Sequence, residues 1–152
     1  MPQYAGPERM ISATPLRPVK GAATILTEAD NGALCVWLTA AGYLYTLPAP
    51  VVGMYFDFMV RTTITSVGAK VITNAATVFI TGSFLQLPDT AGQAVYRLAD
   101  SAATVAWNGN GTTTGGYSGD SFRLTAISDT LWAMTNGVGL ATGSEATPFA
   151  AS

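Results

Sequence analysis

The segment Met54-Tyr55-Phe56-Asp57-Phe58-Met59-Val60 decides the fold class, because large apolar residues occupy every second position. In an extended chain, side chains two residues apart point to the same face. One face therefore carries four apolar side chains, those of Met54, Phe56, Phe58 and Val60. This period of two predicts a strand with one face in the core.

Shorter segments of the same character lie on both sides of this strand. Aliphatic, aromatic and threonine residues are concentrated in residues 23–27, 34–38, 43–47, 71–73, 77–81, 84–87, 103–107, 121–127 and 131–135. Residues 93–98 fit either a strand or one helical turn. Turn-forming residues separate the segments, and no amphipathic helix longer than about two turns is evident. About eight to ten short strands predict an all-β fold, an antiparallel β-sandwich or a jelly roll.

The composition of the 152-residue chain predicts one domain with two extensions. Residues 1–20 hold half of the eight prolines, which favours either a disordered leader or an extended N-terminal arm that becomes ordered against a partner. Residues 21–137 carry the predicted β-sandwich domain. Residues 138–152, rich in Gly, Ala and Thr, predict a flexible C-terminal tail. The Gly-rich run 108–119 predicts a flexible or tightly turning loop.

Charged residues make up only 11% of the chain, the formal charge is −2 and the mean hydropathy is +0.33. A free monomer normally carries more charges, so either a membrane or other protein chains should cover the surface. The longest uncharged stretches, residues 31–56 and 71–88, contain glycine, proline and polar residues and fit strands better than spanning helices. Lys and Arg are not clustered, which argues against nucleic acid or an anionic membrane as a partner. The composition therefore indicates assembly with other protein.

Residue types that carry common catalytic chemistry are absent or isolated. The chain has no histidine and one cysteine, Cys35, which excludes histidine-based triads and cysteine-rich zinc sites. Asp57 lies within a strand, and we expect it to face solvent or to pair with Arg61 or another basic residue. The remaining aspartates fall at predicted turns, where Asp accepts hydrogen bonds from its own backbone: Asp30, Asp89, Asp100, Asp120 and Asp129. The sequence predicts no enzyme, no metal site and no cofactor.

The aromatic residues fit core and interface packing. Three tryptophans lie on predicted strands and are expected to anchor the core, namely Trp37, Trp107 and Trp132. Four tyrosines fit packing or, alternatively, a carbohydrate-stacking surface: Tyr43, Tyr45, Tyr55 and Tyr117. Cys35 is predicted to be a small buried hydrophobic residue.

Three segments together resemble a known family. They are TLPAPVVGMYFDF (residues 46–58), the Ile-Thr pairs within residues 71–73 and 79–82, and GDSFRLTAISDTLWAM (residues 119–134). Their order and spacing resemble a β-domain of tailed-bacteriophage virion proteins, which include capsid decoration (cement) proteins and tail-fibre domains. The similarity covers roughly residues 22–136 and includes no catalytic motif.

The resemblance implies a jelly-roll-like subunit that is made in the host cytoplasm and assembles as a homotrimer on the outer surface of the phage capsid. Its partner would be the major capsid protein, whose neighbouring subunits it would clamp. On this hypothesis the arm and tail bind the capsid through Tyr4, Met10, Ile11, Leu16 and Phe149. The trimer interface would include Tyr43, Tyr45, Tyr55 and Asp57.

Two other functions fit the same sequence. A phage tail-fibre or receptor-binding domain would bind glycans through the loop 108–119 and exposed tyrosines. A polysaccharide-degrading enzyme would use a carboxylate such as Asp57 or Asp120.

Overall fold

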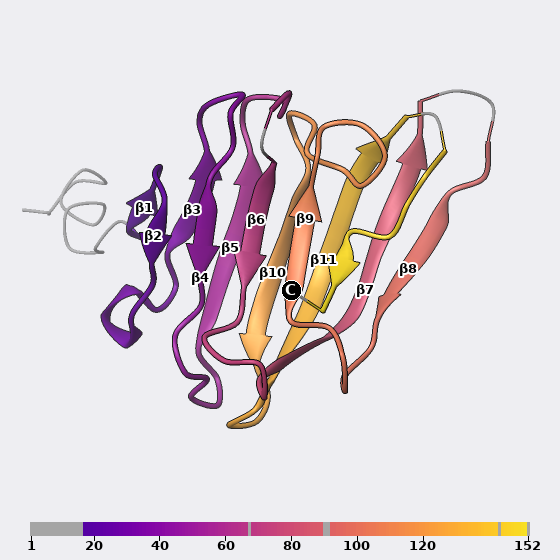
Figure 1. Cartoon of the computed structure of the whole chain (residues 1–152). Coiled ribbons are helices and arrows are strands. Elements are labelled where there is room, and N and C mark those ends of the chain that lie inside the picture. Colours follow the sequence, from indigo (N-terminus) through magenta and orange to yellow (C-terminus); the bar gives the residue numbers. More distant parts are fainter. Residues whose placement is uncertain (1–16, 67, 90–91, 143, 152) are drawn as a thin grey trace, which may run out of the picture.

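The computed structural model describes residues 17–66, 68–89, 92–142 and 144–151, which form two packed β-sheets (Figure 1). The larger sheet has the spatial order β1 (Val19–Lys20), β3 (Leu34–Trp37), β5 (Tyr55–Val60), β10 (Ser121–Ala126), β11 (Leu131–Ala141), β7 (Phe79–Pro88) and β8 (Val95–Ala99). The smaller sheet has the order β12 (Phe149–Ala150), β9 (Ala106–Gly109), β6 (Ala69–Ile72), β4 (Leu44–Thr46) and β2 (Thr24–Ile25). A short 3-10 turn, η1 (Glu28–Asp30), precedes β3. The predicted all-β sandwich is confirmed.

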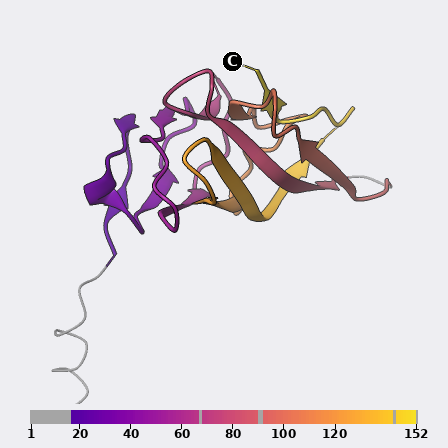
Figure 2. The ribbon, with the colours of Figure 1, turned by 90° about the horizontal axis from the view of Figure 1, so that it is seen from below.

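Strand pairing is mixed, which corrects the antiparallel, jelly-roll-like arrangement expected from the sequence. β1, β3 and β5 pair in parallel in one sheet, and β2, β4 and β6 do so in the other. The physical reason is the path of the chain, which crosses to the opposite sheet after each of these strands (Figure 2). Every second strand then returns to the same sheet in the same direction. Antiparallel hairpins follow later and join β7 to β8 and β10 to β11.

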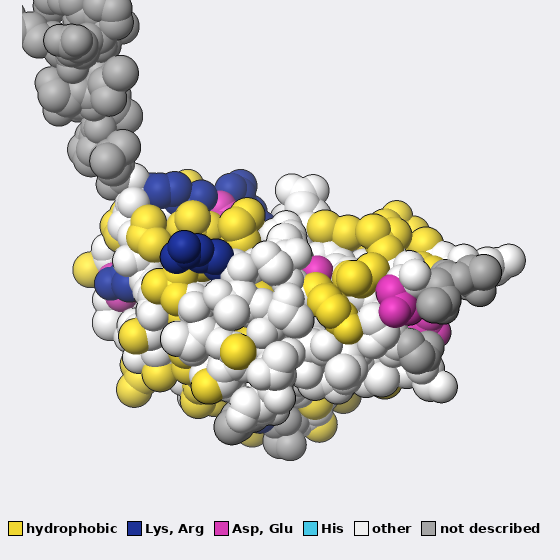
Figure 3. Space-filling view, turned by 90° about the horizontal axis from the view of Figure 1, so that it is seen from above, with side chains coloured by type: hydrophobic (Ala, Val, Ile, Leu, Met, Phe, Trp, Pro, Cys, Tyr) yellow, Lys and Arg dark blue, Asp and Glu magenta, His cyan; other side chains and the backbone are white. Residues whose placement is uncertain are grey.

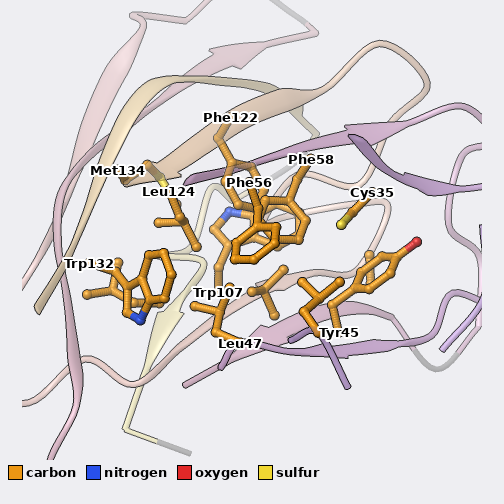
Figure 4. Packing of buried hydrophobic residues seen from close by; sticks show 14 of the residues in the cluster. Cys35, Tyr45, Leu47, Phe56, Phe58, Trp107, Phe122, Leu124, Trp132 and Met134 are labelled. Atoms are coloured by element: carbon orange, nitrogen blue, oxygen red, sulfur yellow. The ribbon is translucent and has the colours of Figure 1, made fainter. Parts of the chain in front are cut away.

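Aromatic side chains from both sheets interlock in the core (Figure 4). Trp107, on β9 of the smaller sheet, lies 4.6 Å from the ring of Phe122 and 5.6 Å from that of Trp37, both in the larger sheet. Phe122 in turn stacks on Phe58 of β5 at 5.0 Å. All three tryptophans are fully buried, and so is the apolar face predicted for residues 54–60. The predictions of core anchors and of a core strand are confirmed.

The two ends of the sandwich domain differ from the predicted boundaries. Residues 138–141 continue β11, and residues 149–150 form β12, which pairs with β9, so the described part of 138–152 is not a free tail. Gln86 and Arg97 hold the connecting segment by donating hydrogen bonds to the carbonyl oxygens of Ala146 and Glu145, both at 2.8 Å. At the other end, β1 already belongs to the larger sheet. The described part of the chain contains no helix long and apolar enough to cross a bilayer.

The glycine-rich loop 108–119 is a tight, hydrogen-bonded turn. The Asn110 side chain accepts hydrogen bonds from the backbone N–H groups of Thr112 and Thr114 at 2.8 and 3.1 Å. The buried Asp120 carboxylate accepts those of Gly116 and Tyr117 at 2.7 and 3.0 Å. Of the two conformations left open by the sequence, the tightly turning one is present.

Gly111 should be the least replaceable residue of this loop. Its φ is +73°, and a Cβ atom there would lie 1.7 Å from the carbonyl oxygen of Ile64. Gly53 is the matched control, because its φ is +90° but nothing lies within 4 Å of an added Cβ. We expect Gly53→Ala to lower the free energy of unfolding by about 1–2 kcal/mol through left-handed strain alone. Gly111→Ala should cost about 1–3 kcal/mol more through overpacking, as measured by urea denaturation. Equal losses would contradict the tight packing of the loop on Ile64.

Candidate functional site

The outer face of the larger sheet carries the most distinctive group of polar side chains. β5 and β10 lie side by side, and Asp57 is directly opposite Arg123 in their antiparallel register. Because their neighbours Phe56, Phe58 and Phe122 point into the core, the alternation of the strands turns Asp57 and Arg123 outward. The period of two that builds the core thus also builds this site.

Two arginines bind the Asp57 carboxylate. Arg123 donates from Nε to Oδ1 at 2.7 Å and from Nη2 to Oδ2 at 2.8 Å, which makes a bidentate pair. Arg17 reaches Oδ2 through Nη2 at 2.7 Å. Arg17 is itself held by the carbonyl oxygens of Gly32 and Ala33, at 2.9 and 3.2 Å. The expectation that Asp57 pairs with a basic residue is confirmed, but the partners are Arg123 and Arg17 rather than Arg61.

These contacts fix the charge state and the position of the cluster. The hydrogen bonds from Arg123, and then those from Arg17, lower the pKa of Asp57 despite its partial burial. The carboxylate is therefore ionised near neutral pH, and the three side chains carry a net charge of +1. The Arg123 guanidinium also lies over the ring of Tyr55, 4.5 Å from its centroid, in a cation–π arrangement.

A hollow of about 370 Å³ opens beside this cluster. Its polar lining includes Ser121 and Asn136 in addition to the three charged residues. Its exposed apolar lining comes from Leu34 and Met59, and Phe58 and Phe122, whose side chains are buried, complete the wall. The hollow thus offers basic groups next to apolar surface, a combination suited to binding part of another protein.

A β-bulge on β11 separates this hollow from a second one. The register between β11 and β7 shifts between Met134 and Gly137, and Asn136 within the shift has a φ of +53°. The second hollow, of about 430 Å³, lies across the bulge and is lined by Ser83, Leu85, Tyr96, Met134, Thr135, Asn136, Gly137 and Val138. The pair Asn136-Gly137, which follows the predicted strand 131–135 and ends the predicted domain, instead lies at the bulge inside a longer strand.

The β8 edge of the same sheet is apolar and exposed. Tyr96 and Leu98 on β8 are 66% and 76% exposed, and Leu87 on the neighbouring β7 is 40% exposed. Figure 3 shows hydrophobic side chains at both ends of the molecule, beside Lys and Arg at the β1 end and beside Asp and Glu at the β8 end. Large exposed apolar side chains on a sheet edge are typical of an interaction surface.

The structure separates the residues predicted for the trimer interface. Tyr55 and Asp57 lie together on the outer face, within the arginine cluster. Tyr45 is fully buried in the core, and its hydroxyl donates to the carbonyl oxygen of Lys20 at 2.8 Å. Tyr43 packs against the core and donates to the carbonyl oxygen of Val36. The prediction of Tyr45 as an interface residue is therefore wrong, because its ring is inside its own subunit.

Of the five residues predicted to bind the capsid, the structure describes one. Phe149 is 9% exposed and packs in the core from β12, so its prediction as a surface contact is wrong. The other four, Tyr4, Met10, Ile11 and Leu16, lie outside the described residues. Sequence reasoning missed Arg17 and Arg123, which no local pattern distinguishes from other exposed arginines. The signal available in the sequence was the scarcity of basic residues, because the chain has only seven Lys and Arg.

Other reactive groups are held in structural roles. The Asp120 carboxylate, 6% exposed, accepts three backbone hydrogen bonds, the third from Leu140 at 3.0 Å, and burial raises its pKa. Burial raises the pKa of the Cys35 thiol to about 12, which keeps it protonated. In the described ranges, no three residues among His, Cys, Asp and Glu come together as a metal site.

Comparisons with protein-family models, with curated proteins and with solved structures found no match for this chain.

Replacing Asp57 by asparagine should expose the contribution of the cluster to stability. We expect Asp57→Asn to lower the free energy of unfolding by about 1–2 kcal/mol at pH 7, a modest figure because both arginines are partly exposed. The pKa of Asp57 is lowered in the folded protein, so its stabilisation is present above the unfolded pKa. It is lost as the pH falls through the pKa of Asp57 in the folded protein, which lies below the ordinary value of about 4. Urea denaturation at pH 7 and at pH 3 measures the loss of stability at neutral pH and its decrease at low pH.

The control for this experiment is Asp129→Asn, which changes an exposed turn residue that forms no ion pair within the described residues. It should alter the free energy of unfolding by less than about 0.5 kcal/mol at either pH. A deficit of Asp57→Asn that is as large at pH 3 as at pH 7 would contradict the charge-based account.

Proposed function

We propose that the protein is a structural virion protein that decorates a phage capsid. It assembles as a homotrimer on the outer surface of the head and binds the major capsid protein. The observation that carries the proposal is the outer face of the larger sheet, where an arginine cluster and exposed apolar side chains share one surface. The low charge of the chain and the resemblance of residues 22–136 to phage virion β-domains support it.

The proposal assigns different contacts to the two ends of the larger sheet. Residues 1–16 precede Arg17, which is anchored to Asp57 and lines the hollow beside Arg123. We assign this end, with the preceding arm, to the capsid. We assign the β8 edge, with Tyr96 and Leu98, to contacts between copies of the protein. An interface of ordinary size buries roughly 1,600 Å² in total, and three linked copies would strengthen a weak capsid contact through multivalency.

A glycan-binding domain of a phage tail fibre is the second candidate. The observation that favours it is the second hollow, which is lined only by uncharged residues and includes the exposed Tyr96 as well as Asn136. An exposed aromatic ring can stack on a sugar while amide and hydroxyl groups bind its hydroxyls. On this alternative the site would be that hollow rather than the loop 108–119, many of whose polar groups already have partners in the loop or in neighbouring segments.

Removing the arm separates its role from that of the sandwich. Deletion of residues 2–16 leaves Arg17 and β1 in place, so we expect a folded trimer that no longer binds capsids. Light scattering measures the assembly, and co-sedimentation with undecorated capsids measures binding. Replacing Tyr4, Met10, Ile11 and Leu16 by serine should have the same effect at full length, while Gln3→Ala with Ser12→Ala should not. A monomer, or unchanged capsid binding by the deletion variant, would contradict the proposal.

A further inference from the structure

We propose that the hollow beside Arg17 and Arg123 accepts a carboxylate from an acidic segment of a partner protein. The proposed function supplies the identity of the partner, a capsid subunit, while the chemistry of the hollow supplies the carboxylate. The inference thus rests on the proposed function for the partner alone.

The hydrogen-bond donors of the two arginines are only partly used. Arg123 binds Asp57 through Nε and Nη2, and Arg17 uses Nε and Nη2 for Gly32, Ala33 and Asp57. Within the described residues, the Nη1 group of neither arginine has an acceptor. Each Nη1 group carries two N–H donors. Both side chains line the hollow and are about two-fifths exposed, so a ligand can reach them.

The cluster is held in position before any ligand arrives. Asp57 and two backbone carbonyls anchor Arg17, and Asp57 together with the ring of Tyr55 anchors Arg123. Arginine in a fixed position loses less side-chain entropy on binding, and its planar fork matches a carboxylate. This arrangement differs from a free surface arginine, which must be ordered by its ligand.

The surroundings favour a carboxylate on a protein over a phosphate or nucleic acid. One net positive charge is balanced by one carboxylate, whereas nucleic-acid binding needs several clustered basic residues. Leu34 and Met59 line the hollow near the arginines and can contact the methylene groups of an acidic side chain and its apolar neighbours. The whole chain also carries a formal charge of −2, which repels polyanions.

The test uses the full chain and a capped hexaglutamate peptide as the probe. Titration is followed at low ionic strength through the Arg Nε–H signals in ¹⁵N NMR spectra. We expect a saturable shift of the Arg123 and Arg17 signals that is reversed by salt. Inorganic phosphate at the same concentration should produce a much smaller shift. Because no capsid is used, failure here and failure of capsid decoration are separate outcomes.

Two substitutions with opposite expected effects distinguish binding from a structural role. Arg123→Gln removes one guanidinium and should weaken peptide binding about tenfold. Asp57→Asn raises the net charge of the cluster from +1 to +2 and frees donors on both arginines. This gain outweighs the loss of the Asp57 anchor, because Gly32, Ala33 and the Tyr55 ring still hold the two side chains, so the substitution should tighten binding severalfold despite lower stability. Arg61→Gln is the matched control: Arg61 is exposed, forms no ion pair in the described residues, and its loss should leave binding unchanged.

Three results would overturn the proposal. They are the absence of any saturable shift with the peptide, an equal response to phosphate, and weaker rather than tighter binding by Asp57→Asn. Thermal unfolding of each variant confirms that the compared proteins are folded at the temperature of the titration.

Discussion

The contact between Trp107 and the aromatic side chains of the opposite sheet is the interaction on which the rest of the structure depends. The five strands of the smaller sheet are each only two to four residues long, too short to be stable alone. Trp107, fully buried, packs against Phe122, Phe84 and Trp37 and joins the two layers. The chain can therefore cross between the sheets after each early strand, because the strands before and after each crossing pack into the same core.

The same packing determines what the surface presents. With alternate residues of β5 and β10 committed to the core, the residues between them face outward, and the register places Asp57 against Arg123. Arg17 then links the start of the described chain to this pair. The result is a surface on which the arginine cluster lies toward the β1 end of the larger sheet and exposed apolar side chains lie at both ends.

The fold class and the core were predictable from the sequence, whereas pairing and long-range contacts were not. The alternation of residues 54–60 predicts which side chains are buried, but it does not predict which strand lies alongside, so the parallel pairs were missed. Tyr45 was expected at the trimer interface and Phe149 on the capsid, within a flexible tail, yet both side chains are buried in the core. The Arg17–Asp57 contact joins residues far apart in the chain, and no local pattern indicates it.

Immunogold electron microscopy of intact phage particles, with an antibody against this chain, tests the central claim most directly. If these sheets are shielded by sibling copies and a capsid, label should cover the whole surface of the head. Label confined to the tail tip would contradict the account. Unlabelled particles from a lysate that contains the protein would contradict it as well.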